Sequence, residues 1–338
     1  MVLVPLIFLV LATLSDYRPE EVIDLGSGEG TAAIPVDDTL SLVTWNIGYA
    51  GLGREMDFFY DGGKQVRPSE ILYKKYWQGI QGKLEEFSGE YDFVLLQEID
   101  VSSKRSYYND QYAGIRPVFT GYLSNFAFNY RVTYVPAPLI RPMGKVRSGM
   151  ALISLFPPES SLRIAFEGNF SWPTGLFMLD RCFIKNRYVT SSGKELVVIN
   201  THNSAFDDGE LRAKQLEALR SVMLDEYEKG NYVITGGDWN MNPGGFRVYL
   251  CTTGDMQFTI KPEVPPGFFP EGWTWAFDQE IPTNRFLLES YLRSRTPTTT
   301  IDFFVASPNV EVLETITVDL NFENSDHHPV TIQVRLKP

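Results

Sequence analysis

Polar side chains that could bind a metal or move a proton follow short apolar runs at several places in this 338-residue chain. Glu98 follows FVLLQ, where a carboxylate needs a cation or hydrogen-bond donors close by. His202 follows VVINT, and Asp238 and Asn240 follow VITGG as part of DWN. One such residue alone is an ordinary turn residue. Several of them indicate a site, because sheet ends are where loops bring distant residues together.

The same arrangement recurs elsewhere in the chain. Asn46 ends LVTWN, Asp302 opens IDFFVAS, and Asp326, His327 and His328 precede the apolar run PVTIQV. All three histidines of the chain therefore lie in these segments. Oxygen donors suit a hard divalent cation, and an imidazole beside a carboxylate can accept a proton from water.

The apolar runs have the length and composition of strands. They are rich in β-branched and aromatic residues and cover Leu40–Trp45, Phe93–Leu96, Ala151–Leu155, Leu196–Asn200, Tyr232–Thr235, Ile301–Ala306 and Val330–Val334. Helical spacing predicts helices over Ser69–Phe87 and Gly209–Lys229. The irregular alternation of strands and helices favours sheets with helices on their outer faces. Gly254–Thr300 has several prolines and little periodicity, so we expect a long surface excursion near the site.

Composition limits the classes of protein. Hydrophobic residues make up 43% of the chain, which is globular composition and excludes disorder or a coiled coil. The net charge is −12, which argues against broad coating of DNA but does not exclude a nuclease. Cys182 and Cys251 match no zinc motif and cannot form a disulfide framework. We expect both thiols to be buried.

The N-terminal region differs from the rest of the chain. Val2–Leu14 is apolar apart from Thr13, but it is shorter than the roughly 20 residues that cross a bilayer. We interpret residues 1–14 as an anchor or signal remnant, with a buried N-terminal strand or helix as the alternative. Residues 15–38 are acidic and predict a flexible linker. We expect residues 39–338 to form the folded catalytic domain. We also expect the protein to be a monomer and to be membrane-anchored or secreted.

The motifs together resemble those of the endonuclease/exonuclease/phosphatase superfamily, which includes deoxyribonuclease-like and neutral sphingomyelinase-like enzymes. The resemblance covers about residues 40–338 and rests on TWN at 44–46, LLQE at 95–98, SGMALIS at 148–154, NTHNS at 200–204, GGDWN at 236–240, ID at 301–302 and SDHHP at 325–329. It implies an α/β (α+β) fold, a four-layer sandwich of two central mixed sheets flanked by helices. It also implies metal-dependent hydrolysis of a phosphodiester or phosphomonoester.

The resemblance carries roles to individual positions, beginning with the metal. Glu98 resembles the Mg²⁺ ligand of the family, with Asn46 beside it. Asp326 resembles a residue that holds a second cation in some members. Mn²⁺ is an alternative to Mg²⁺.

The remaining residues of the set resemble the groups that transfer protons and stabilise charge. His327 resembles the base that deprotonates the attacking water, and Asp302 resembles the partner that fixes its tautomer. His202 and Asn240 resemble donors to the phosphate oxygens. Asp238 resembles the residue that orients the nucleophile or assists the leaving group.

Residues that contact the substrate are less defined. Asn203 stands where Leu or Ser is often found, and it either reaches the substrate or shapes the loop. Arg105 is a candidate phosphate contact in Val101–Val146, an aromatic-rich stretch. These aromatics are interpreted as a stacking platform for bases, an apolar rim at a lipid interface, or strand packing. We expect His328 to be structural.

Three functions stay open at this point. The first is an exported or membrane-tethered phosphodiesterase acting on lipid headgroups, inositol phosphates or other small phosphoesters, with membrane association through residues 2–14. The second is a nuclease acting on nucleic acid, DNA or RNA, and the third is a non-catalytic binding module on the same fold. A continuous basic groove would favour nucleic acid, and an apolar rim beside the metal would favour lipid.

Overall fold

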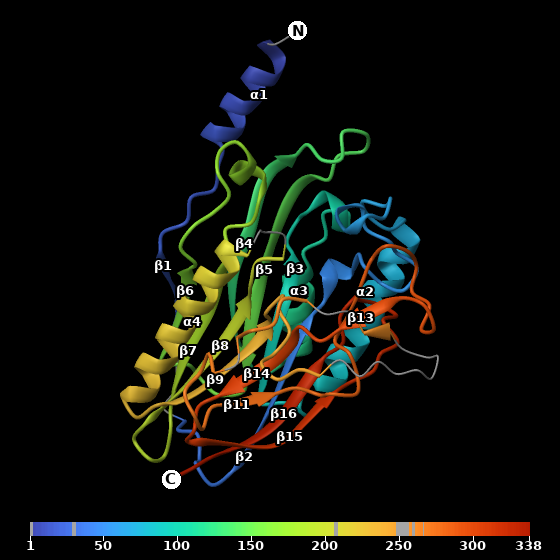
Figure 1. Cartoon of the computed structure of the whole chain (residues 1–338). Coiled ribbons are helices and arrows are strands. Elements are labelled where there is room, and N and C mark those ends of the chain that lie inside the picture. The colour runs from blue at the N-terminus through green and yellow to red at the C-terminus, as the bar shows by residue number, and fades with distance from the viewer. Residues whose placement is uncertain (1–2, 29–31, 206–208, 248–256, 259–260, 266) are drawn as a thin grey trace.

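The computed structural model describes residues 3–28, 32–205, 209–247, 257–258, 261–265 and 267–338 (Figure 1). One central sheet has six strands, namely β2 (Thr39–Asn46), β3 (Phe93–Asp100), β4 (Leu123–Val135), β5 (Gly144–Ser154), β15 (Val310–Thr317) and β16 (Val330–Leu336). Their order is β15-β16-β2-β3-β5-β4. β2 and β3 are parallel and the other neighbours are antiparallel, so the sheet is mixed.

The second central sheet has seven strands in the order β1-β6-β7-β8-β9-β14-β11. Their bounds are β1 (Val22–Gly26), β6 (Ser160–Ala165), β7 (Cys182–Val189), β8 (Glu195–His202), β9 (Tyr232–Asp238), β11 (Thr274–Ala276) and β14 (Asp302–Ala306). A small third sheet holds β10 (Gln257–Phe258), β12 (Asn284–Arg285) and β13 (Pro297–Thr299).

Four α-helices and five 3-10 turns complete the described part of the chain. The helices are α1 (Leu3–Leu14), α2 (Glu70–Phe87), α3 (Gln111–Ile115) and α4 (Glu210–Glu228), and the turns are η1 (Gly48–Ala50), η2 (Phe59–Asp61), η3 (Lys104–Ser106), η4 (Arg116–Val118) and η5 (Thr174–Phe177). Both predicted long helices are confirmed to within one residue at each end. α2 begins after Ser69, whose Oγ accepts the Leu72 N–H at 3.3 Å.

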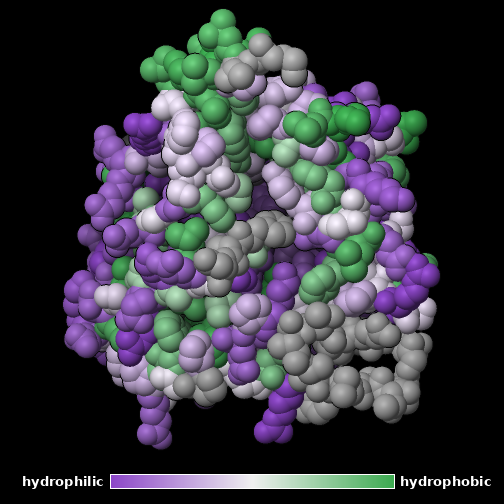
Figure 2. Space-filling view, turned by 45° about the horizontal axis from the view of Figure 1, so that its top comes forward, coloured by the Kyte–Doolittle hydropathy of each residue, from purple (hydrophilic) through white to green (hydrophobic). Residues whose placement is uncertain are grey.

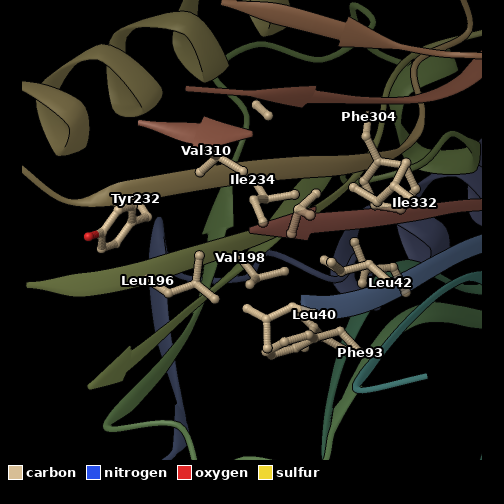
Figure 3. Packing of buried hydrophobic residues seen from close by; sticks show 14 of the residues in the cluster. Leu40, Leu42, Phe93, Leu196, Val198, Tyr232, Ile234, Phe304, Val310 and Ile332 are labelled. Carbon is tan, nitrogen blue, oxygen red and sulfur yellow. The ribbon is translucent and has the colours of Figure 1, made fainter. Parts of the chain in front are cut away.

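The core lies between the two large sheets and continues on their outer faces. Alternate residues of a strand face opposite sides, so in β2 Leu40 and Leu42 join the cluster between the sheets. Val43 and Trp45 of the same strand pack with α2. Figure 3 shows this inner cluster, where Leu42 and Ile332 of one sheet lie with Ile234 and Phe304 of the other. Burial on both faces explains why these strands read as continuous apolar runs.

α4 covers the outer face of the second sheet. Leu216, Leu219 and Met223 of α4 join Val197 and Val233 of β8 and β9 in a separate cluster. The layers are therefore helix, sheet, sheet and helix, and the predicted four-layer sandwich is confirmed. The parallel pairs β2–β3 and β8–β9 end at the edge of the sandwich where the polar motifs follow.

The predicted flexible linker over residues 15–38 is wrong in part. Within it, β1 pairs antiparallel with β6, with Ile23 opposite Arg163. Ile34 is fully buried in the central cluster. The edge strand is held by backbone hydrogen bonds and so needs no long apolar run, which is why a five-residue strand was not recognised within an acidic segment. Residues 29–31 lie outside the described residues.

The N-terminal apolar segment forms α1, and the alternative of a buried segment is wrong. None of the residues of α1 is buried. Phe8 stacks on Phe177 of η5 at 5.8 Å and meets Tyr134 of β4 edge-on at 6.0 Å. Among the residues that the structure describes, no helix is long and apolar enough to cross a membrane.

The stretch Gly254–Thr300 contributes more than a surface excursion. Its described part forms β10, β11, β12 and β13, and Asn284 of β12 pairs with His327 through an isolated bridge. Residues 254–256, 259–260 and 266 lie outside the described residues, as does Cys251. Cys182 is buried as a free thiol, as predicted.

Candidate active site

Strand register brings three of the predicted residues of the second sheet onto one level. β8 and β9 run parallel with His202 opposite Asp238. β14 runs antiparallel to β9, which places Asp302 opposite Asp238 on its other side. In the first sheet, the parallel pair β2–β3 sets Asn46 opposite Gln97, one residue before Glu98. The candidate residues of both sheets therefore lie at one end of the sandwich.

The loop that carries His327 is tied to the end of β2. Ser325 Oγ donates to the carbonyl of Asn46 at 2.8 Å and accepts the His327 N–H at 3.2 Å. The indole N–H of Trp45 donates to the carbonyl of His327 at 3.0 Å. These three bonds hold the imidazole at the strand end without using its ring nitrogens.

Glu98 owes its direction to an irregularity in β3. The pairing of β3 with β5 shifts between Leu96 and Ile99, and Glu98 lies in the left-handed region with φ +56°. A β-bulge of this kind turns a side chain out of the regular alternation. The Glu98 side chain is 25% exposed, whereas its neighbour Gln97 is fully buried. A left-handed non-glycine residue costs of order 1–3 kcal/mol, which is typical of functional sites.

The glycines of GGDWN allow the two parallel strands to approach each other. Gly237 has φ +148°, and a Cβ there would lie 2.0 Å from the carbonyl oxygen of Thr201. Only glycine fits that approach. The close pairing of β8 and β9 holds Asp238 beside His202.

His327 and Asp302 form the buried pair that the resemblance implies. His327 Nδ1 donates to Asp302 Oδ2 at 2.8 Å, and both residues are buried. The Asn284 amide lies 3.0 Å from His327 Nε2. This network assigns the proton of a neutral imidazole to Nδ1. The Nε2 lone pair then accepts an N–H of Asn284 and can accept a proton from water that replaces this contact.

The charges around His327 determine its protonation. Burial disfavours the imidazolium, but the carboxylates of Asp302 and Asp326 outweigh burial and raise the pKa of His327. Burial also raises the pKa of Asp302. A positive charge next to Asp326 would offset this negative field and bring His327 back toward the neutral form that accepts a proton.

His202 lies between two carboxylates and is neutral. Its Nε2 is 3.5 Å from Asp238 Oδ2 and 3.8 Å from Glu98 Oε1. Burial, with the charge of Arg181, holds the pKa of His202 well below its usual value. Arg181 also donates to the carbonyl of His202 at 3.3 Å.

Asn240 and Asn203 are joined through the loop after β8. Asn240 donates its backbone N–H to Asp238 Oδ1 at 2.9 Å and its Nδ2 to the carbonyl of Asn203 at 3.0 Å. Asn203 is fully buried, and its Oδ1 accepts the hydroxyl of Thr201 at 2.6 Å. Of the two predictions for Asn203, these contacts favour a loop-shaping role. Asn240 Nδ2 keeps a second hydrogen for a ligand.

The residues present fit a divalent cation held between Glu98 and Asp326. Both side chains line the same cavity. Asp326 Oδ1 is buried and has no hydrogen-bond partner among the described residues. Burial, with the charge of Glu98, raises the pKa of Asp326 to about 7. Carboxylate oxygens of this kind are the ligands that Mg²⁺ prefers.

Asn46 is oriented differently from the prediction. Its Oδ1 accepts the Gly48 N–H at 3.0 Å, and its Nδ2 donates to Asp238 at 3.0 Å and to Glu98 at 3.3 Å. In this arrangement Asn46 positions two carboxylates, and ligation of a metal by its oxygen stays a prediction.

A second group also has the spacing of a metal site. One ligand atom each of Asp238, Asp302 and His327 lies within 4.8 Å of the others. The carboxylates of this group already accept hydrogen bonds within the protein: Asp302 accepts one from His327, and Asp238 accepts one each from Asn46 and Asn240. We therefore favour Glu98 and Asp326 as the ligands.

The cavity that contains these groups has a wall of large apolar side chains. They come from several loops and from β4, and are Tyr49, Leu52, Phe58, Tyr60, Tyr130, Met143, Phe170, Met178, Leu179, Leu211, Phe286 and Leu287. Arg105 also lines the cavity, but it is buried, paired with Asp100 at 2.9 Å and stacked over Tyr49 at 3.5 Å. Contact of Arg105 with a substrate stays a prediction.

Sequence reasoning missed several polar residues of the cavity. Asn284, Arg181 and Lys261 are among them. Asn284 and Lys261 lie in or near the proline-rich stretch, where neither helical nor strand periodicity marked a position. Arg181 precedes β7 without any motif around it. Only the folded chain brings them to the site.

His328 has the structural role that was predicted. Its ring stacks on Phe322 at 3.7 Å, its Nε2 accepts the Phe322 N–H at 3.2 Å, and its Nδ1 lies 3.0 Å from the carbonyl of Pro282. Burial lowers the pKa of His328, so the ring is neutral at ordinary pH.

We expect His328→Ala to lower the free energy of unfolding by about 2–4 kcal/mol, because it removes a buried ring and leaves the Phe322 N–H unpaired. Denaturant unfolding measures this loss. The catalytic rate per folded molecule is expected to stay within about threefold of the parent. A stable variant without activity would show that His328, rather than His327, belongs to the site.

Comparison with known proteins agrees with this geometry. The model of the Endonuclease/Exonuclease/phosphatase family matches residues 43–327. The chain therefore belongs to this family of phosphoesterase and nuclease hydrolases. No curated protein matches the sequence.

Solved structures show the same fold at low sequence identity. An endonuclease/exonuclease/phosphatase from Beutenbergia cavernae is 19% identical with a TM-score of 0.57, over 88% of this chain and 72% of that one. The human nocturnin catalytic domain with bound sulfate is 16% identical with a TM-score of 0.55, over 95% and 99% of the two chains. D. rerio TDP2 with a single-strand DNA product is 16% identical with a TM-score of 0.52, over 88% and 100%.

Proposed function

We propose that the protein is a Mg²⁺-dependent phosphodiesterase that hydrolyses a lipid headgroup or a similar small phosphoester with an apolar part. The buried His327–Asp302 pair supports the hydrolytic part of the proposal, because His327 lines the same cavity as the carboxylates of Glu98 and Asp326. The apolar wall of the same cavity supports the substrate class. Mn²⁺ has the same preference for oxygen ligands and is the alternative metal.

The reaction that this geometry suits is in-line attack of water on phosphorus. His327 Nε2 takes the proton of the water, while Asp302 holds the imidazole through Nδ1 and stabilises the imidazolium that forms. Asn284 Nδ2 lies 3.0 Å from Nε2 and keeps the ring plane fixed until water is bound.

Charge develops on the phosphate oxygens as the fifth bond forms. The second Nδ2 hydrogen of Asn240 is placed to meet such an oxygen, and neutral His202 lies beside it. Asp238 accepts from Asn46 and Asn240 and so fixes both amides. A divalent cation held by Glu98 and Asp326 would neutralise charge on the phosphate.

The lining of the cavity is the observation that favours a lipid phosphoester over nucleic acid. Two of its cations are buried and already engaged: Arg105 pairs with Asp100, and Arg285 donates to the carbonyls of Leu52, Gly53 and Met56. A nucleic-acid groove needs many available cations along a backbone. An apolar wall instead suits the glycerol or acyl part of a lipid.

The proposal is tested by comparing two substrates with the full chain in Mg²⁺. We expect release of phosphorylated or free headgroup from phospholipid vesicles, and much slower nicking of supercoiled plasmid. EDTA and His327→Ala are the controls, and both should abolish the release. Nicking that is lost in both controls, without hydrolysis of any lipid, would make the protein a nuclease. No hydrolysis of either substrate by folded protein would support a binding module.

A further inference from the structure

Apolar side chains gather at the end of the molecule where α1 lies. α1 is apolar apart from Thr13, and Leu3, Val4, Leu6, Leu11 and Leu14 are all more than half exposed. Figure 2 shows a group of hydrophobic side chains (green) at the top of the molecule, the end at which Figure 1 places α1. A helix of 12 residues is about 18 Å long, close to the half-thickness of about 15 Å of a bilayer core.

The tip of the β4–β5 hairpin exposes the second apolar group at this end (Figure 1). Leu139 and Ile140 at the tip are 94% and 84% exposed, the highest values among the large apolar residues described. The hairpin is joined to α1 by the edge-on contact of Tyr134 with Phe8. The two apolar groups are therefore parts of one surface.

Trp172 marks the boundary between this apolar surface and the charged residues below it. It is 63% exposed, and its indole N–H donates to Thr13 Oγ1 at the end of α1 at 3.3 Å. Asp16 and Arg18 follow α1 directly. A tryptophan with one polar bond at such a boundary is typical of side chains at a membrane–water interface.

The β4–β5 hairpin has a charge opposite to that of the whole chain. The hairpin spans residues 123–154 and contains four basic residues, Arg131, Arg141, Lys145 and Arg147, and no Asp or Glu. Residues 2–15 and 168–179 contain no charged side chain. The whole chain carries −12. The hairpin part of the apolar end is therefore positive, which complements an anionic lipid surface, whereas the acidic residues Asp16, Glu20 and Glu21 lie in the segment that follows α1.

The candidate active site is continuous with the same end of the molecule. Tyr130 and Met143 of the hairpin line the cavity of His327, as do Phe170 and Met178 on either side of the Trp172 segment. A surface bound at the hairpin tip and at Trp172 would thus lie next to the mouth of the cavity.

We infer that α1, Leu139–Ile140 and Trp172 together form a docking face for an anionic phospholipid bilayer. α1 enters one leaflet, the hairpin tip and Trp172 lie at the interface, and the basic residues of β4 and β5 contact the headgroups. Docking does not depend on the proposed lipid hydrolysis. Only the consequence that lipid headgroups reach His327 as substrates rests on the proposed function. Two anchoring elements give firmer attachment than either one alone.

Flotation of the full chain with vesicles of equal parts phosphatidylcholine and phosphatidylglycerol tests the inference. The test variant is Leu139→Asp/Ile140→Asp, and the matched control is Leu313→Asp/Ile316→Asp, which alters two exposed apolar residues of β15. We expect about a tenfold lower bound fraction for the hairpin variant and no change for the control. Hydrolysis of a soluble chromogenic phosphodiester should be equal in all three proteins, because none of these residues contacts the catalytic groups.

Equal binding of the hairpin variant and the parent would overturn the composite face. The inference would also be overturned if the unaltered protein did not float but formed a dimer, and if the hairpin variant were a monomer. The apolar face would then bind a second copy of the chain. Binding by the inactive His327→Ala variant, with the same loss in the hairpin variant, would support docking whatever the enzyme hydrolyses. Flotation without any lipid hydrolysis would contradict the proposed function and leave the docking face intact.

Discussion

Replacing His327 with alanine is expected to lower kcat for phosphodiester hydrolysis by about 10³-fold, a loss of about 4 kcal/mol of transition-state stabilisation. The reason is that its Nε2 is the acceptor for the water proton, while Nδ1 is held by Asp302 at 2.8 Å. KM should change little, because the imidazole acts mainly in the transition state. Steady-state kinetics on a soluble chromogenic diester measure both quantities.

The neighbouring histidine provides the control for this prediction. His328 is as buried as His327 but stacks on Phe322 and faces away from the cavity residues. His328→Ala should reduce stability and keep the rate per folded molecule. If His327→Ala kept its kcat while His328→Ala lost it, the assignment of the base would be wrong.

The second large effect concerns the metal. Glu98→Gln is expected to raise the Mg²⁺ concentration for half-maximal activity by about 100-fold, because even indirect partners of a metal contribute 10–100-fold to its affinity. The side chain keeps its size and its place on the bulge of β3, so folding should be preserved. Activity as a function of Mg²⁺ concentration, after removal of metal with EDTA, measures the shift.

Glu85→Gln is the matched control, since it makes the same chemical change on the exposed face of α2. It should leave the Mg²⁺ dependence unchanged. An unchanged dependence in Glu98→Gln as well would assign the metal to other residues, first of all the group of Asp238, Asp302 and His327.

The strands that carry the site could be predicted because their two faces are both buried. An apolar run that ends in Glu98, His202 or Asp238 is visible in the sequence, and parallel pairing aligns such ends at one edge. The pairing of His327 with Asp302 was implied only by the family resemblance. The structure contains this pair, with His327 Nδ1 2.8 Å from Asp302 Oδ2.

Short strands held by backbone pairing, and the exposure of individual side chains, could not be predicted from the sequence. β1 is an edge strand of only five residues, VIDLG, which does not stand out from the acidic segment around it and is held by its pairing with β6. Asn284 reaches His327 through a two-residue strand, too short for any periodicity. No sequence pattern indicated a role for Leu139 and Ile140, and only the structure shows that they are exposed at a hairpin tip. The position of a side chain on a surface depends on tertiary contacts that local sequence does not encode.

Addition of Mg²⁺ back to the EDTA-treated full chain is the measurement that tests the central claim most directly. Hydrolysis of a chromogenic phosphodiester should be absent without metal, return with Mg²⁺, and stay absent in His327→Ala at every Mg²⁺ concentration. This result would establish a metal-dependent phosphoesterase that uses His327. The same rate with and without EDTA, or the same rate in His327→Ala, would contradict the account.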